Sequence, residues 1–109
     1  MSKSHLVVLG AGPGGYSAAF HAADQGYKVT LVDASLNLGG VCLHSGCIPS
    51  KALLHIVGLL AETKQVKDRG IDFDDPRIDL KRLNKWKDEI ISNFSGGLDL
   101  LCKQRGINY

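Results

Sequence analysis

The sequence predicts an α/β fold in which a helix connects two parallel strands. Three observations support it: an apolar run at 6–9, an Ala-rich segment at 16–25 that stops at Gly26, and a second apolar, β-branched run at 27–32. Short continuous apolar runs are typical of strands buried in a parallel sheet, and glycine commonly ends a helix. Together these segments form a βαβ unit, whose crossover is right-handed.

The middle of the chain predicts a loop followed by a helix. Residues 34–47 contain several glycines and are expected to form a loop. A helix is expected to begin near Ile48 and Pro49, because proline suits the first helical turn. Residues 70–77 predict an exposed connection beyond it.

The last third predicts a long amphipathic helix that Asp79 can cap. Apolar side chains recur there at spacings of three and four residues: Leu83, Trp86, Ile90, Phe94, Leu98 and Leu101. Gly106 is expected to end this helix, and residues 107–109 to begin a third strand. Two strands and the start of a third make a small sheet, so we expect residues 1–109 to be the first part of a domain in a longer protein.

Composition excludes several classes of protein. With 109 residues, of which 44% are hydrophobic and 22% charged, the chain matches a small globular unit. A net charge of +2 gives no reason to expect nucleic acid or an anionic membrane as a partner. No uninterrupted apolar run approaches the roughly 20 residues of a membrane span, and no signal-peptide pattern is present. Three cysteines are too few for a secreted disulfide scaffold, which favours the cytoplasm.

A glycine-rich turn follows the first strand. Its pattern is G-x-G-x-x-G with Gly10, Gly12 and Gly15, and Asp33 follows 18 residues later at a strand end. Gly10 permits the tight turn, Gly12 lets backbone approach a pyrophosphate, and Gly15 lets helix and strand pack closely. A carboxylate at Asp33 can accept hydrogen bonds from both ribose hydroxyls. The order of these parts is typical of a Rossmann-like dinucleotide site. Two alternatives are a glycine-rich turn that binds nothing and a stand-alone nucleotide-binding module without redox chemistry.

Two cysteines lie five positions apart in the expected loop. Gly46 gives the backbone between Cys42 and Cys47 freedom to bring them to disulfide distance. Cys47 lies just before a helix, whose dipole favours a thiolate. Lys51 follows one turn later and can point toward the same site, or it can be an ordinary solvated lysine.

Other interpretations of these residues stay open at this stage. Cys42 and Cys47 can be buried and inert, can form a structural disulfide, or can bind zinc with His44, although only His55 offers a fourth ligand nearby and the spacing is unusual for zinc. We expect no metal site. Cys102 is expected to be a small packing residue in the long helix.

Residues 39–54, with the sequence GGVCLHSGCIPSKALL, resemble the redox-active segment of the flavin-dependent pyridine-nucleotide disulfide oxidoreductases. Within that family the run at 48–54 is most similar to the branch that oxidises dihydrolipoamide. Two departures stand out: Val41 replaces a common Thr, and His44-Ser45 replaces a usual Asn-Val. Neither removes a reacting atom.

The resemblance implies FAD as the nucleotide of this segment, with the glycine turn on the pyrophosphate and Asp33 on the adenosine ribose. The residues implied to contact FAD are Gly10, Gly12, Gly14, Gly15, Asp33, Ala34, Gly39, Gly40, Val41, Cys42, Cys47 and Lys51. Cys47 would be the charge-transfer thiolate facing the flavin, and Cys42 the thiol that exchanges with substrate. NAD would bind a domain beyond residue 109.

The implied reaction oxidises a dithiol in two half-reactions. The disulfide takes two electrons by exchange with the dithiol, and FAD passes them to NAD⁺. Implied partners are dihydrolipoamide on the lipoyl domain of a 2-oxoacid dehydrogenase complex and, in the complete protein, a second copy as a homodimer. Alternatives within the family are the substrates of mercuric reductase, glutathione reductase or soluble transhydrogenase. The 109-residue chain alone is expected to be inactive.

Overall fold

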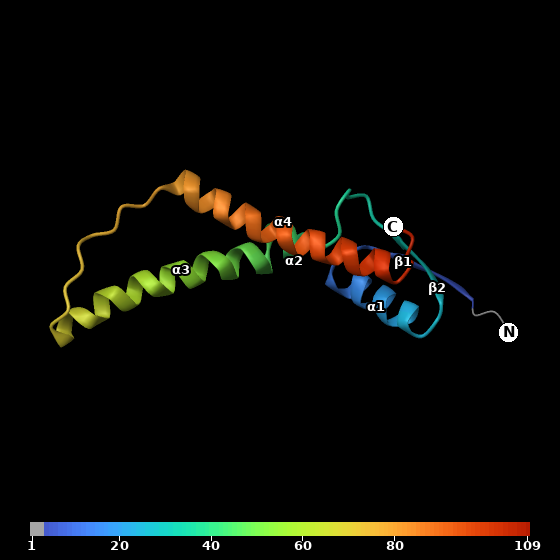
Figure 1. Ribbon diagram of the computed structural model, residues 1–109, viewed down its shortest axis with the longest axis horizontal. Coiled ribbons are helices and arrows are strands. Elements are labelled where there is room, and N and C mark those ends of the chain that lie inside the picture. The colour runs from blue at the N-terminus through green and yellow to red at the C-terminus, as the bar shows by residue number, and fades with distance from the viewer. Residues whose placement is uncertain (1–3) are drawn as a thin grey trace.

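The computed structural model describes residues 4–109 as an elongated α/β molecule. Its elements are β1 (His5–Leu9), α1 (Pro13–Asp24), β2 (Lys28–Val32), α2 (Gly40–Ser45), α3 (Cys47–Gln65), the 3-10 helix η1 (Val66–Arg69) and α4 (Leu80–Gln104). The strands, α1 and the end of α4 gather at one end, while α3 and the start of α4 extend away from it (Figure 1). The extents are 71 × 27 × 19 Å and the radius of gyration is 19.9 Å, against about 13 Å for a compact domain of similar length.

The sheet confirms the predicted βαβ unit. β1 and β2 pair in parallel, with Val7 opposite Thr30. On the other edge of β2, Leu31 N donates to Asn108 O over 2.7 Å, and Asn108 N donates to Val29 O over 3.1 Å. The predicted third strand therefore begins its parallel pairing at the end of the chain.

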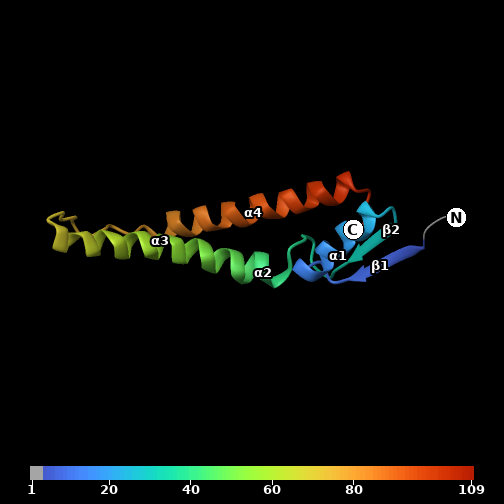
Figure 2. The ribbon, with the colours of Figure 1, turned by 90° about the horizontal axis from the view of Figure 1, so that it is seen from below.

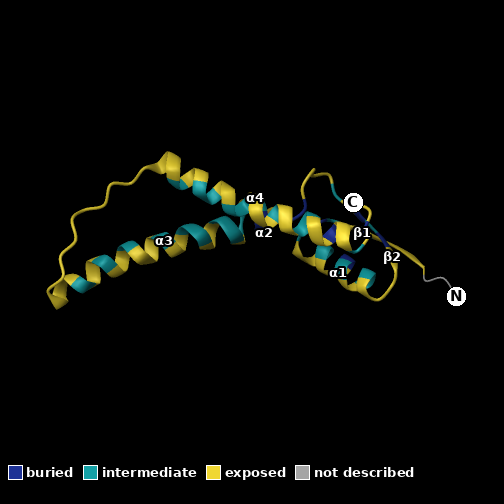
Figure 3. Cartoon of the chain, viewed as in Figure 1, coloured by how far each residue is buried: buried dark blue, intermediate teal, exposed yellow. Residues whose placement is uncertain are grey.

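The core lies entirely at the sheet end of the molecule. Its buried apolar residues are Ala11, Ala19, Val29, Leu31, Leu38, Leu43, Cys102 and Ile107. In Figure 3 the ribbon is coloured as buried on α1, β2, the last turns of α4 and the loop before α2. Cys102 is 2% exposed, which confirms it as a packing residue, and burial raises the pKa of its thiol, with a smaller contribution from the charge of Asp99.

Two predicted boundaries were wrong. α1 begins at Pro13, not at residue 16, so Gly14 and Gly15 belong to its first turn. Proline fits there because N–H groups of the first turn have no intrahelical acceptor, so its missing N–H costs no hydrogen bond. The expected loop at 34–47 contains α2. Its glycine-rich start conceals a helix, since Gly39 and Gly40 take φ values of 127° and 62°, which turn the backbone sharply into it.

The predicted helices of the second half are confirmed. α3 begins at Cys47, which places Pro49 in its first turn. Asp79 caps α4, its Oδ1 accepting from Arg82 N over 3.1 Å. Residues 70–79 are irregular and exposed. Figure 2 shows α3 and α4 extending together toward the far end, where η1 and this connection join them.

The segment Gly40–Arg69 is long and apolar enough, by length and composition alone, to cross a membrane. A search for uninterrupted apolar runs does not find this segment, because apolar and polar residues are interspersed along it. Gly46 separates its two helices, α2 and α3. Core helices of soluble proteins pass the same test, so the finding carries no assignment to a membrane.

Candidate active site

Asp33 holds the glycine turn to the end of β2. Its Oδ2 accepts from Ala11 N and its Oδ1 from Ser35 N, each over 2.8 Å. These two backbone N–H groups lower the pKa of the Asp33 carboxyl. A carboxylate offers about four lone-pair positions, so capacity remains for two further donors such as ribose hydroxyls. Sequence reasoning did not foresee the structural part of this role.

The glycine turn and α1 pack so closely at Gly15 that there is no room for a side chain. A Cβ added to Gly15 would overlap the carbonyl oxygen of Gly10, whereas a Cβ on Gly14 would meet nothing within 4 Å. Gly10 itself has a φ of 102°. The first N–H groups of a helix lack intrahelical acceptors, and those at the start of α1 favour an anion. The turn therefore fits the pyrophosphate of a dinucleotide.

The start of α2 packs directly on this turn. Gly39 N donates to Ala11 O over 2.9 Å. A Cβ on Gly40 would come within 2.7 Å of Gly12 Cα, and a Cβ on Gly39 would overlap the side chain of Leu43. The glycines that were predicted only to line a cofactor thus also join two parts of the chain at van der Waals distance.

Cys42 on α2 and Cys47 at the start of α3 form a disulfide, with their Cα atoms 4.6 Å apart. Gly46 separates the helices, and a Cβ there would lie 2.9 Å from Val41 O. The bridge occupies both sulfurs, so neither is a thiolate ligand for zinc in this state. Within residues 4–109, no group of three or more His, Cys, Asp or Glu side chains could hold a metal ion.

The exposure of the two cysteines is the reverse of what the implied roles would require. Cys47 is exposed and Cys42 is half-buried, whereas a flavin-facing Cys47 would be covered and Cys42 would be open to substrate. The surface in question is that of the protein alone, and a flavin ring lying on Cys47 would cover it. The division of roles between the thiols therefore stays a prediction.

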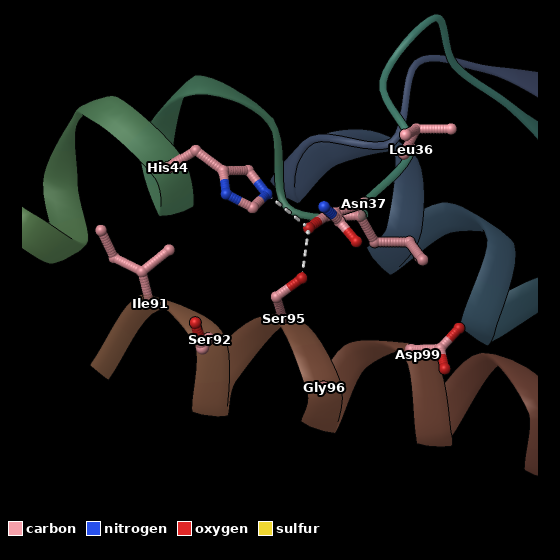
Figure 4. Close-up of a pocket in the computed structure, with 9 residues that line it drawn as sticks. Leu36, Asn37, His44, Ile91, Ser92, Ser95, Gly96 and Asp99 are labelled. Atoms are coloured by element: carbon pink, nitrogen blue, oxygen red, sulfur yellow. Dashed lines mark hydrogen bonds between the residues drawn. The ribbon is translucent and has the colours of Figure 1, made fainter. Parts of the chain in front are cut away.

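A cavity of about 370 Å³ is bounded by three segments: α2, the loop that follows Asp33, and α4. Its lining residues are Leu36, Asn37, Leu38, His44, Ile91, Ser92, Ser95, Gly96 and Asp99. In it, His44 Nε2 lies 2.9 Å from Leu38 O and Ser95 Oγ lies 3.5 Å from the same oxygen (Figure 4). Sequence reasoning gave His44 no role except as a zinc-ligand alternative. The sequence signal for a role of His44 was the presence of histidine at a position where the family usually has Asn.

Three further residues were predicted to contact the cofactor, and no interaction among residues 4–109 assigns a role to their side chains. Ala34 follows Asp33 and is exposed, Val41 is 76% exposed on α2, and Lys51 is exposed in α3 one turn after Cys47. Each lies on the same stretch of chain as the disulfide or the turn. Their contacts with a cofactor stay predictions.

The sequence matches the pyridine nucleotide-disulphide oxidoreductase family over residues 4–109. The chain belongs to this family. It is 46% identical to the dihydrolipoyl dehydrogenase of Vibrio cholerae over 106 residues, which are 97% of this chain and 22% of that protein. It is 47% identical to the Haemophilus influenzae enzyme of that name and 44% to the Haloferax volcanii one, over 96% of this chain and 22% of each. The chain therefore spans about a fifth of the length of these relatives.

Membership of the pyridine nucleotide-disulphide oxidoreductase family confirms the predicted resemblance and the α/β fold class. It also agrees with the geometry of the site: a disulfide lies on two helices, and the first of them is packed against a dinucleotide-type turn. The residues present in this family member can hold the pyrophosphate and ribose of FAD.

Proposed function

We propose that the complete protein is a flavin-dependent oxidoreductase that oxidises dihydrolipoamide to lipoamide and reduces NAD⁺. The observation that carries the proposal is the Cys42–Cys47 disulfide, held against the nucleotide-type turn through Gly12 and Gly40. The name dihydrolipoyl dehydrogenase, shared by the relatives described above, supports the choice of substrate.

The chain's own residues bind and orient the cofactor. The first turn of α1 holds the FAD pyrophosphate, and the Asp33 carboxylate accepts from the ribose hydroxyls. The segment from Ala34 to Cys42 lies along the cofactor, and Lys51 lies near the flavin edge. When bound, FAD would supply the two-electron redox chemistry that links the reduced cysteine pair to NAD⁺.

Cys42 and Cys47 perform the dithiol half-reaction by exchange. One substrate thiolate attacks Cys42 Sγ, which breaks the Cys42–Cys47 bond, forms a mixed disulfide and releases Cys47 as a thiolate. The second substrate thiolate then attacks the substrate sulfur of the mixed disulfide and releases Cys42. The substrate loses two electrons and two protons; the cysteine pair gains the electrons, and the protons pass to the pair or to solvent.

The proposal extends to the setting of the complete protein. Residues 1–109 supply the first part of the FAD domain, and other parts of the protein supply the NAD domain and the interface of a homodimer. The dithiol is carried on the lipoyl domain of a 2-oxoacid dehydrogenase complex, and the compartment is the cytoplasm. The support for these statements is the similarity to the relatives over 22% of their length.

Cysteine variants of the complete protein test the proposal. Cys42→Ser should abolish dihydrolipoamide turnover and leave a long-wavelength absorbance band from the Cys47 thiolate beside oxidised flavin. Cys47→Ser should abolish both. Stopped-flow absorbance measures the band, and NADH formation measures the turnover.

Cys102→Ala is the matched control, because it removes the third cysteine from the core and should leave turnover intact. Full turnover in both serine variants would reject the disulfide mechanism. Wild-type protein that prefers glutathione disulfide or Hg²⁺ would reject the substrate. The 109-residue chain alone should not reduce NAD⁺, because part of the sheet, one wall of the cofactor site and the proposed NAD domain are not in it.

A further inference from the structure

We propose that His44 is a positioning residue that holds α2 in place and thereby favours the Cys42–Cys47 disulfide over the open dithiol. Its importance for turnover rests on the function proposed above. Its effect on the thiol–disulfide equilibrium is a property of this site alone and can be measured separately.

The geometry places His44 between the disulfide and the preceding loop. Its Nε2 lies 2.9 Å from Leu38 O, and Leu38 is only 1% exposed. A carbonyl oxygen only accepts hydrogen bonds, so Nε2 carries the proton and donates. The imidazole reaches from α2 toward the loop, and Ser95 Oγ approaches the same oxygen from α4 (Figure 4). Three segments thus meet at one buried carbonyl group.

α2 depends on such contacts for its position. It has six residues and no side-chain cap, and helices this short are not stable in isolation. Leu43 is its only buried residue, and Gly40 packs on Gly12 at its first turn. His44 supplies the hydrogen bond from the last turn of α2. Because Cys42 precedes it by two positions on the same short helix, a constraint on His44 is a constraint on Cys42.

Reduction of the disulfide requires the two sulfurs to separate from about 2 Å to non-bonded distance. Cys47 lies in the first turn of α3, which has 19 residues, whereas Cys42 lies on α2, which has six. We therefore expect the separation to shift the shorter helix, α2, relative to α3. The bond from His44 to Leu38 opposes that shift. Its loss should therefore make the disulfide easier to reduce.

Equilibration of the complete protein in dithiothreitol buffers tests this inference. In each buffer the dithiothreitol is oxidised to its cyclic disulfide as the cysteine pair gains two electrons and two protons. Acid quenching, alkylation and mass spectrometry give the fraction of disulfide. His44→Leu should be reduced at a three- to tenfold lower ratio of reduced to oxidised dithiothreitol, which is the usual weight of one hydrogen bond.

A second variant separates the hydrogen bond from simple packing. His44→Gln places an amide N–H at nearly the position of Nε2 and should restore the wild-type equilibrium. His55→Ala removes an exposed histidine from α3 and serves as the matched control, with no expected change. If His44→Leu folds poorly, His44→Asn carries the same prediction, because its shorter amide cannot reach Leu38 O.

Wild-type equilibria in both His44→Leu and His44→Asn would overturn the inference, as would failure of His44→Gln to restore the equilibrium. Dihydrolipoamide turnover of the wild-type protein is measured in parallel. Absent turnover with a shifted His44→Leu equilibrium would reject the proposed function and support the role of His44. Full turnover with unshifted equilibria would reject the role of His44 and leave the proposed function intact.

Discussion

The two ends of the molecule differ in how they use apolar residues. The nucleotide end, residues 4–46 and 102–109, holds every buried residue between 4 and 109. The helical arm, residues 47–101, holds none, although α3 is rich in Leu, Ile and Val. A sheet covered by a helix encloses side chains from several directions, whereas two helices side by side cover only one stripe of each other. Apolar composition therefore does not by itself make a core.

Glycines show the same difference. In the nucleotide end, Gly15, Gly39 and Gly40 lie where a Cβ would overlap neighbouring atoms, but in the arm Gly58 and Gly97 have nothing within 4 Å of an added Cβ. The same substitution should therefore have opposite consequences in the two regions.

Gly15→Ala should disrupt the nucleotide end. The added methyl group would overlap the Gly10 carbonyl oxygen, so α1 and β1 must separate. We expect a loss of about 3 kcal/mol or more in the free energy of unfolding, measured by urea titration with far-UV circular dichroism. Gly14→Ala, in the same turn but facing open space, is the control and should change stability by less than about 1 kcal/mol. Equal effects of the two substitutions would contradict the packing described here.

Asp33 should make the stability of the nucleotide end depend on pH. Because two backbone N–H groups lower the pKa of its carboxyl, the ionised form stabilises the fold fully above the unfolded value of about 3.9. That contribution is lost as pH falls through the lower folded pKa. Asp33→Asn should therefore have a lower thermal midpoint than the wild type at pH 7, and the difference should shrink at pH 3.

Asp74→Asn is the control for this experiment, because Asp74 lies in the exposed connection of the arm. Its thermal midpoint should match the wild type at each pH. A difference between Asp33→Asn and wild type that stays constant from pH 7 to pH 3 would show that the carboxylate charge is not the cause.

Gly58→Ala should have the smallest effect and the opposite sign. Gly58 lies inside α3 with no neighbouring atom near the added methyl group, so alanine should stabilise the helix by about 0.5–1 kcal/mol. Circular dichroism at 222 nm during thermal unfolding measures the gain. Gly106→Ala, which follows α4 at a φ of 63°, should destabilise instead, because alanine is strained there.

Sequence reasoning predicted the parts of the fold that repeat a pattern. The strands around Val7 and Thr30, the cap at Asp79 and the pairing at Asn108 all follow from local composition and spacing. α2 was not predicted, because a six-residue helix with one buried side chain, Leu43, shows no hydrophobic periodicity. The glycine turn and the disulfide were predicted as separate features, and their contact was not, since the approach of Gly40 to Gly12 depends on backbone angles that the sequence does not encode locally.

The contact between Gly12 and Gly40 limits how this architecture can be rearranged. The two glycines belong to segments 28 positions apart in the chain. A Cβ on Gly40 would lie 2.7 Å from Gly12 Cα, whereas a Cβ on Gly12 would meet Gly40 Cα at an ordinary 3.8 Å. A graft of residues 39–47 that replaced Gly40 by a residue with a side chain would set the transplanted helix farther from the turn that it packs on. The close approach is consequently encoded in the disulfide segment itself, and a designer who wants this redox pair in another scaffold must retain Gly40 as well as the two cysteines.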